Sequence, residues 1–252
     1  AASDRGALLF EHARVRQLER AGAGWKLRAA GGEVTARNVL LCTNAYTDDL
    51  WPGLRRSIIP VRAFQIWTRP VADAVAATIL PGIAAFHDSR RLISGARKHA
   101  GGRLQFGGSL PLFGPERPPD IDAALRHIRR LFLQLQQIEV EGWWSGWVTR
   151  GIADGWRLHE LAPGLMTAIA CNGRGVAMGP IMGRELVRYL GGTPGDDLLV
   201  PVSPLAGILG YSVHKPFAAI AARYFSWCDE REMRRLMLMN RRVGAGSAVR
   251  PG

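Results

Sequence analysis

The stretch AIACNGRGVAMGPIMGRELVRYLGG, Ala168–Gly192, combines a strand end, a glycine-containing turn and a helix. The run Leu165–Ala170 is short and apolar, which predicts a buried strand. Val176–Leu190 carries apolar residues at helical spacing, and two glycines followed by a proline end it. The amides that open such a helix lack internal partners and lie at its positive end. This stretch therefore predicts an anion site at the turn between strand and helix.

The spacing of the turn Asn172–Gly175 leaves three interpretations open. Its glycines can serve a tight turn and nothing else. A dinucleotide fingerprint, G-x-G-x-x-G, is a second possibility, but Met178 stands where the third glycine belongs. The acids that should follow, Asp196 and Asp197, lie in a Gly/Pro loop and not at the end of a strand. A third interpretation, a flavin site, comes from resemblance to a known family.

Length and composition set the broad class of the protein. The chain has 252 residues, of which 47% are apolar, enough for a core and for one or two domains. No apolar run reaches about 18 residues and no signal-peptide pattern opens the chain, so we expect no membrane span. The formal charge is +12, but the arginines are spread along the chain, which argues against a nucleic-acid surface.

The cysteines Cys42, Cys171 and Cys228 form no C-x-x-C pair. This spacing argues against a disulfide framework and against a zinc site, so we expect no metal. Free cysteines are typical of a reducing compartment, and we expect a cytoplasmic protein. Cys171, at a predicted strand end, is interpreted as a packing residue.

The remaining chain alternates β segments with two helices. Residues 7–46 predict β structure, with a strand in GALLFEHARVRQLER and a buried strand at Val39–Cys42. Further elements are predicted as follows: an alternating strand from Val61, a hairpin at 84–110 with its turn at 100–102, a helix capped by Asp120 with an apolar stripe to Leu135, a strand at Glu139–Val148, a helix at Phe217–Trp227, and a frayed basic tail from Arg231.

The run CNGRGVAMGPIMGRELVRYLGG resembles the C-terminal flavin-contacting segment of the D-amino-acid-oxidase-like FAD-dependent oxidoreductases, which include glycine, sarcosine and γ-glutamylputrescine oxidases. The turn CTNAY at 42–46 and the segment R-x-x-x-x-G-R-L-x-F-G-G from Arg97 to Gly108 are also similar to that family. The segment 144–165 resembles it with departures, because Gly151, Ala153 and Trp156 stand where the family has Thr, Asp and Pro.

The resemblance implies FAD as the cofactor. The residues that it places at the cofactor are Val15, Thr43, Asn44, Ala45, Asn172, Gly173, Arg174, Gly175, Val176 and Ala177, mostly through main-chain amides. Gln65, Trp67 and Arg150 are the candidates for substrate contact. From the residues alone, sheet packing for Gln65 and Trp67 and a surface position for Arg150 remain open. Gly107 and Gly108 are expected to let backbone approach the flavin or its pocket. No catalytic side chain is predicted.

The fold implied is α+β (α/β), with an incomplete Rossmann-like FAD domain at 1–60 and 150–215. An antiparallel-sheet substrate domain with a covering helix is expected at 61–149, and a C-terminal helix and basic tail at 216–252. The resemblance implies oxidation of an amine or amino acid by hydride transfer to the flavin. It covers the C-terminal two-thirds of the family, so the partner expected is a missing N-terminal FAD-binding segment. The alternative is a non-catalytic truncated chain that acts only by pairing with such a segment.

Overall fold

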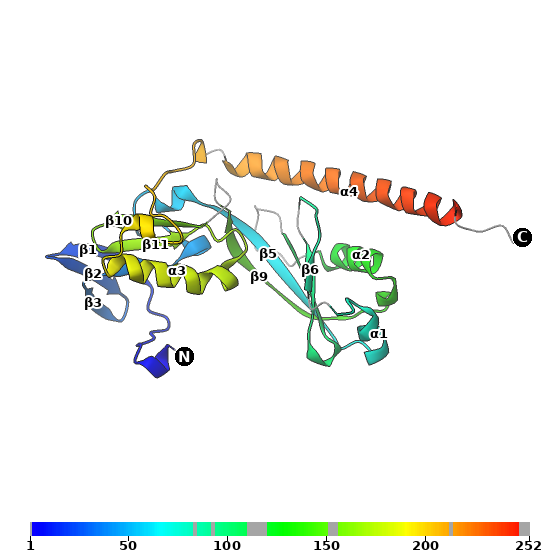
Figure 1. Ribbon diagram of the computed structural model, residues 1–252, viewed down its shortest axis with the longest axis horizontal. Coiled ribbons are helices and arrows are strands. Elements are labelled where there is room, and N and C mark those ends of the chain that lie inside the picture. The colour runs from blue at the N-terminus through cyan, green and yellow to red at the C-terminus, as the bar shows by residue number, and fades with distance from the viewer. Residues whose placement is uncertain are drawn as a thin grey trace, which may run out of the picture. The chain divides into compact units, whose positions relative to one another are not determined.

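The computed structural model describes residues 2–82, 85–91, 94–109, 120–150, 156–211 and 214–246 (Figure 1). The chain divides into two compact units. Unit 1 comprises Ala1–Pro60 and Val148–Tyr211, and unit 2 comprises Val61–Trp147 and Ser212–Gly252. Each unit joins segments that are distant in sequence, so neither is a contiguous domain.

Unit 1 begins with a three-stranded antiparallel meander. Strands β1 (Val15–Ala21), β2 (Gly24–Ala29) and β3 (Gly32–Ala36) pair in sequence order. The turn between β1 and β2 contains Gly22 with φ of 57°, a conformation that glycine adopts without strain. The predicted strand started too early: Leu8, Leu9 and Phe10 are 81%, 72% and 72% exposed and lie outside any strand. Apolar content alone made that run resemble a strand.

The second sheet of unit 1 has the order β10-β11-β4 and carries the central stretch of the sequence. Its strands are β4 (Val39–Leu41), β10 (Arg157–Ala162) and β11 (Leu165–Ile169). β11 runs parallel to β4 and antiparallel to β10. All five residues of β11 are buried, the pattern of a strand covered on both faces. The predicted strands at 39–42 and 165–170 are confirmed, each one residue shorter.

Helix α3 (Gly175–Leu190) covers this sheet, and Figure 1 shows it lying along β10 and β11. Met182 and Leu186 are each 1% exposed and pack into a core with Leu158 and Met166 of the strands. The helix begins one residue before the predicted range and ends at the predicted residue. Packing of its apolar face fixes where the first turn of the helix lies, next to the end of β11.

Unit 2 is built on a five-stranded sheet of order β6-β7-β8-β5-β9. The strands are β5 (Ile59–Thr68), β6 (Ala85–His87), β7 (Gly95–Lys98), β8 (Leu104–Ser109) and β9 (Val140–Arg150). Helices α1 (Asp73–Thr78) and α2 (Ile121–Leu131) pack apolar residues against this sheet. The predicted hairpin, its turn at Ala100–Gly102 and the tryptophan-rich strand are all present. The mixed α+β class is confirmed.

Helix α2 shows why its two ends lie where they do. The Asp120 carboxylate accepts the Ala123 N–H at 2.8 Å, so the predicted cap is confirmed. The helix was predicted to extend to Leu135, but it ends at Leu131 because Phe132 is extended, with φ of −127° and ψ of 93°. Phe132 instead packs edge-on against Phe86 and Phe106. Tertiary packing of one aromatic ring thus ends a helix that the apolar pattern would have continued.

The last helix, α4 (His214–Gly246), is much longer than the predicted 217–227, and the tail expected to be frayed from Arg231 is helical to Gly246. Short 3-10 turns complete the chain, at Ser3–Arg5, Asn44–Tyr46, Leu54–Ser57, Ala100–Gly102, Leu133–Leu135 and Gly195–Asp197. Within the described residues, no helix combines the length and apolar character needed to cross a bilayer.

Candidate functional site

The connection from β11 to α3 has an unusual backbone. Ala170, Asn172 and Gly173 have φ of 69°, 46° and 81°, in the left-handed region. Two of the three carry a side chain there, which is uncommon in proteins and marks a constrained turn. The Arg174 N–H donates to the Cys171 carbonyl at 2.8 Å and closes the turn. The chain is therefore held in a fixed path just before the helix starts.

The first turn of α3 is open. Its first backbone hydrogen bond runs from the Met178 N–H to the Arg174 carbonyl at 3.1 Å, so the amides of Gly175, Val176 and Ala177 precede the helical ladder. No side chain of the described residues caps Arg174, and no acid lies in the first turn. The Val176 side chain is 97% exposed. The positive end of the helix therefore remains available to a negatively charged group.

The two glycines of the turn leave space for such a group. A methyl group at Gly173 would meet nothing within 4 Å, and one at Gly175 would meet Cys171 atoms only at 3.8 Å and beyond. Gly173 has a conformational reason to be glycine, because its φ is 81°. Gly175 has neither a positive φ nor a crowded surrounding within the described chain. This absence of a packing reason fits a ligand that approaches the backbone there.

A group of three side chains ties the turn to two other segments; we call Asn44, which is half-buried, and the buried Thr149 and Cys171 the polar triad. The Thr149 hydroxyl accepts the Cys171 N–H at 2.9 Å and donates to the Asn44 side-chain oxygen at 2.7 Å. The Asn44 amide donates to the Cys171 sulfur at 3.1 Å. Thr149 is fully buried. The triad thus brings the segment at 43–45 beside the turn that opens α3.

The triad also changes the acidity of the thiol. Burial disfavours the thiolate, but the hydrogen bonds that reach the sulfur from Thr149, Asn44 and the Gly173 N–H outweigh burial and lower the pKa of Cys171. Sequence reasoning missed this group, treating Cys171 as packing and leaving Thr149 out. Its members are separated by 22, 105 and 127 positions, so no local motif marks them.

The predicted cofactor residues are only partly gathered. Asn44 contacts the turn residue Cys171 directly, and residues 172–177 form the turn and the helix start. The Thr43 hydroxyl lies 2.7 Å from that of Thr47, which bonds the Asn44 carbonyl at 2.7 Å, so residues 43–45 form one compact turn. Val15 belongs to the other sheet of unit 1, where it pairs with Ala29.

In unit 2, Gln65 and Trp67 share one face of β5 because alternate strand residues point the same way. Gln65 accepts a hydrogen bond from Gln105 at 3.0 Å. The Trp67 ring lies 4.7 Å from that of His99 and 6.5 Å from that of Trp144, with the Arg103 guanidinium 5.9 Å from its centre. Arg150 is the last residue of β9, and its side chain lies outside the described part.

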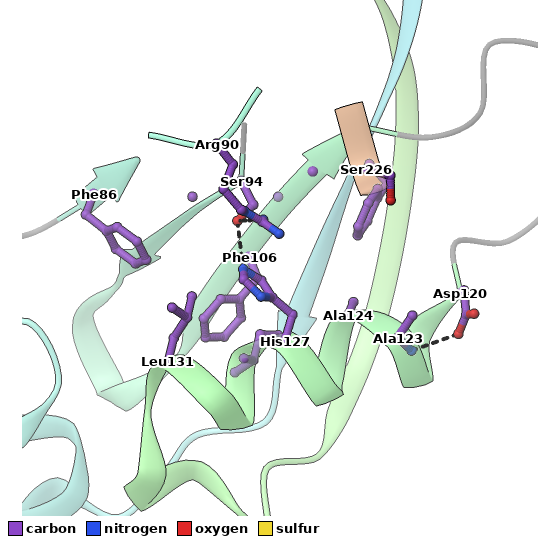
Figure 2. A pocket seen from close by; sticks show the side chains of 15 residues that line it. Phe86, Arg90, Ser94, Phe106, Asp120, Ala123, Ala124, His127, Leu131 and Ser226 are labelled. Atoms are coloured by element: carbon purple, nitrogen blue, oxygen red, sulfur yellow. Dashed lines mark hydrogen bonds between the residues drawn. The ribbon is translucent and has the colours of Figure 1, made fainter. Parts of the chain in front are cut away.

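A cavity of about 320 Å³ lies on the other face of this sheet, between the β7–β8 hairpin, α2 and α4 (Figure 2). Phe86, Phe106 and Leu131 supply apolar walls, and Arg90, Ser94 and His127 line its polar side. Gln65 and Trp67 are not among its lining residues, while the adjacent Phe64 is. The predicted substrate residues and this cavity therefore occupy opposite faces of the sheet.

The polar side of the cavity is internally satisfied. The Arg90 guanidinium donates to the Asp88 carboxylate and to the Ser94 hydroxyl, each at 2.6 Å. The Ser94 hydroxyl donates to Asp88 at 2.7 Å and lies 3.2 Å from the His127 Nε2. Burial, assisted by the nearby Arg90 charge, lowers the pKa of His127. The Ser94 hydroxyl therefore links Asp88, Arg90 and His127 in one hydrogen-bonded group.

Gly107 and Gly108 line the cavity, and both also lie opposite large side chains of the neighbouring strand. A Cβ at Gly107 would lie 2.5 Å from the Gln65 side chain, and one at Gly108 would lie 2.9 Å from the Phe64 ring. Both residues oppose these side chains in the β5–β8 register. Cross-strand packing therefore favours a small residue at both positions, and the expected approach of a ligand to this backbone stays a prediction. Among the described residues, no cluster of His, Cys, Asp and Glu is suited to a metal ion.

Comparison with known proteins finds relatives whose names describe them as oxidoreductases. Probable oxidoreductase OrdL of Haemophilus influenzae is 25% identical over 236 residues, which cover 90% of this chain and 53% of the relative. Gamma-glutamylputrescine oxidoreductase of Escherichia coli K12 is 25% identical over 229 residues, which cover 89% of this chain and 53% of that relative. The chain thus spans about half the length of these curated relatives, a smaller share than the two-thirds that the sequence pattern suggested.

Solved structures show the same fold. Glycine oxidase from Geobacillus kaustophilus superposes with a TM-score of 0.65 at 22% identity, over 77% of this chain and 52% of that one. L-proline dehydrogenase from P. horikoshii gives a TM-score of 0.63 at 16% identity, over 75% of this chain and 52% of that one. The family model for FAD dependent oxidoreductases, DAO, matches residues 1–189, which include both sheets of unit 1 and the open start of α3. The chain therefore belongs to the DAO family of FAD-dependent oxidoreductases.

Proposed function

We propose that this chain is the C-terminal part of an FAD-dependent oxidoreductase that oxidises an amine or amino acid at the C–H next to nitrogen. The open start of α3 supports the proposal most directly. Within the described residues, the amides that precede its helical ladder, the space beside Gly173 and Gly175 and the absence of an acid in the first turn fit the electron-rich pyrimidine end of a flavin. FAD, when bound, accepts the hydride removed from the substrate.

The chain's own contribution in this proposal is positioning and charge. The amides of Gly175, Val176 and Ala177, at the positive helix end, would stabilise negative charge on the pyrimidine side of the cofactor. The polar triad would hold this turn and the segment at 43–45 in one arrangement, so little reorganisation is needed when the cofactor binds. Unit 1 is then the partial FAD-binding part and unit 2 the substrate part. Gln65 and Trp67, on the face of the sheet away from α2, remain the candidates for substrate contact.

We further propose that a segment with a dinucleotide-binding motif completes the site. No G-x-G-x-x-G occurs in the 252 residues, and the chain covers only 53% of its curated relatives. Unit 1 also exposes apolar side chains at Leu8, Leu9, Phe10, Tyr46 and Val176, of which the least exposed is 66% accessible. These side chains would supply apolar contacts for such a segment. The named relatives act as oxidoreductases, and by analogy the substrate is a small amine or amino acid.

The test is co-expression of this chain with the N-terminal segment of a relative that contains G-x-G-x-x-G. We expect a stable pair that retains flavin absorbance and reduces its flavin when an amine or amino acid is added. A pair that forms without turnover would support the alternative, a non-catalytic chain that acts only by pairing. If this chain alone purified with stoichiometric flavin, the need for a second segment would be refuted.

A further inference from the structure

The outer face of α4 carries an exposed apolar stripe. Phe217, Ile220, Tyr224 and Trp227 are 68%, 65%, 58% and 55% exposed. Their spacing of three, four and three residues places them along one side of the helix. We call these four residues the α4 stripe. Apolar side chains of this size gathered on one exposed helix face indicate a binding surface.

The opposite side of α4 is anchored to unit 2. The Asp229 carboxylate, 5% exposed, accepts the backbone N–H of Arg91 and its guanidinium, each at 3.2 Å. Glu232 accepts a second guanidinium bond from Arg91 at 2.9 Å. Asp229 follows Trp227 by two positions, which is about 200° around a helix. The anchor therefore holds the stripe away from the core of unit 2.

Arginines continue the outer face beyond the stripe. Arg231, Arg234 and Arg235 are all exposed, and the Arg231 guanidinium lies 5.3 Å from the centre of the Trp227 ring. Two exposed acids lie among these arginines: Glu230 is 3.7 Å from Arg234, and Glu232, which bonds Arg91, interacts with the charge of Arg235. The whole chain carries a formal charge of +12. The surface thus combines aromatic and aliphatic side chains with positive charge, and its partner should be apolar and anionic.

A second copy of this chain does not offer that complement. In a parallel pair of α4 helices, Arg231 continues the spacing of the stripe and would face its own copy, which is unfavourable. In an antiparallel pair centred on the stripe, the arginines would lie near the partner's helix start, the positive end of its dipole. The charge therefore argues against self-association through this face.

We propose that the α4 stripe and its three arginines form a peripheral binding surface for a bilayer that contains anionic phospholipid. The four apolar side chains enter the boundary between headgroups and acyl chains, where aromatic rings are favoured. The arginines contact lipid phosphates, and each adds attraction to the anionic surface. The helix lies in the plane of the membrane and does not cross it. This surface lies outside residues 1–189, which match the family model, and it does not depend on flavin binding.

The test is sedimentation of the purified chain with vesicles of phosphatidylcholine alone or mixed with phosphatidylglycerol. We expect the chain to sediment with the mixed vesicles at low salt, and to be largely released near 1 M salt, where the Debye length falls to about 3 Å. Free glycerol phosphate at the same phosphate concentration should not displace it, because it offers no apolar layer. Binding of equal strength to phosphatidylcholine alone would overturn the role of the arginines.

Two sets of variants locate the surface. Replacing Arg231, Arg234 and Arg235 by Gln should weaken vesicle binding on the order of 10- to 100-fold. The matched control replaces Arg5, Arg16 and Arg55, which are exposed elsewhere, and removes the same charge. A second variant changes the four stripe residues to Gln. Its control changes Val34 and Leu133 to Gln, at sites that are 56% and 76% exposed elsewhere on the chain. Equal losses in variant and control would overturn the α4 assignment.

Failure of the parent chain to sediment with any vesicle would also overturn the proposal. Loss of vesicle binding in the co-expressed pair would overturn it too, because the stripe would then be covered by the N-terminal segment. So would light scattering that shows a dimer which the four stripe substitutions convert to a monomer, because the stripe would then be a protein interface. Far-UV circular dichroism of each variant establishes that the helix is retained, so that lost binding reports on the surface and not on unfolding.

Discussion

The Thr149 hydroxyl accepts the backbone N–H of Cys171 at 2.9 Å and joins the end of β9 to the turn that opens α3. The same hydroxyl donates to Asn44 at 2.7 Å, so one buried side chain fixes two segments that bear predicted cofactor residues. Neither contact could be derived from local sequence, yet together they set the shape of the candidate site.

Replacing Thr149 by Val should destabilise the chain by about 1–3 kcal/mol, because the Cys171 N–H and the Asn44 side-chain oxygen lose a buried partner. Thr149→Ser keeps the hydroxyl and should recover most of that free energy. Urea unfolding followed by circular dichroism measures both. Equal stability of the Val variant and the parent would mean that these two contacts are dispensable.

The charge of the α3 start can be tested at Val176. An aspartate there would meet the positive helix end and should raise the free energy of unfolding by about 0.3–1 kcal/mol. It should also repel an electron-rich cofactor edge and weaken FAD retention in the co-expressed pair. The stabilising and the inhibiting effect of one substitution would then have the same electrostatic origin.

The matched control is Val187→Asp, at a 64% exposed site in the last turn of the same helix. There the acid faces the negative helix end, so stability should fall slightly while FAD retention stays unchanged. If both substitutions reduced FAD retention alike, the open amides of α3 would not be the flavin contact.

Histidine burial predicts a dependence of stability on pH. Burial, assisted by the Arg157 charge, lowers the pKa of His159, although the bond from its Nδ1–H to the Ser203 carbonyl at 2.7 Å partly opposes the shift. The unfolded chain therefore binds a proton more readily than the folded one near the ordinary histidine pKa of about 6.5. The free energy of unfolding should fall as the pH drops through this value.

His159→Gln removes the difference in proton binding between the folded and the unfolded chain at this position. The slope of the free energy of unfolding against pH between about 5 and 7 should therefore become smaller. His127→Gln should reduce it further, because burial lowers the pKa of His127 as well. Thermal unfolding at a series of pH values, compared with pH 8 where both histidines are neutral, measures the slopes. An unchanged slope in the double variant would contradict the burial argument.

The elements that local pattern determines were predictable. Continuous apolar residues marked β11, helical spacing marked α3, and Asp120 marked the start of α2. The glycine turn before α3 and the resemblance around it led to the family. These features depend on residues close together in sequence, where propensity and hydrogen bonding act directly.

What could not be predicted depends on distant partners. Leu8–Phe10 has the composition of a strand but lies exposed outside any strand. Phe132 ends α2 because two rings from other strands receive it. Gly107 and Gly108 suggested a ligand, and the side chains opposite them on β5 add a packing reason that the sequence did not display. For Phe132 and the two glycines, the deciding contacts are tertiary, and a single sequence does not display them.

The anchor of α4 gives the last prediction. Asp229→Ala removes a nearly buried carboxylate that accepts both the Arg91 N–H and the Arg91 guanidinium. Helix segments that lose such contacts open more often, so backbone amides around residues 225–233 should exchange hydrogen on the order of tenfold faster. Glu232→Gln is the control, because that side chain is 57% exposed and an exposed ion pair contributes little. Equal exchange in the two variants would show that Asp229 does not hold the helix, and the orientation of the α4 stripe would then need another cause.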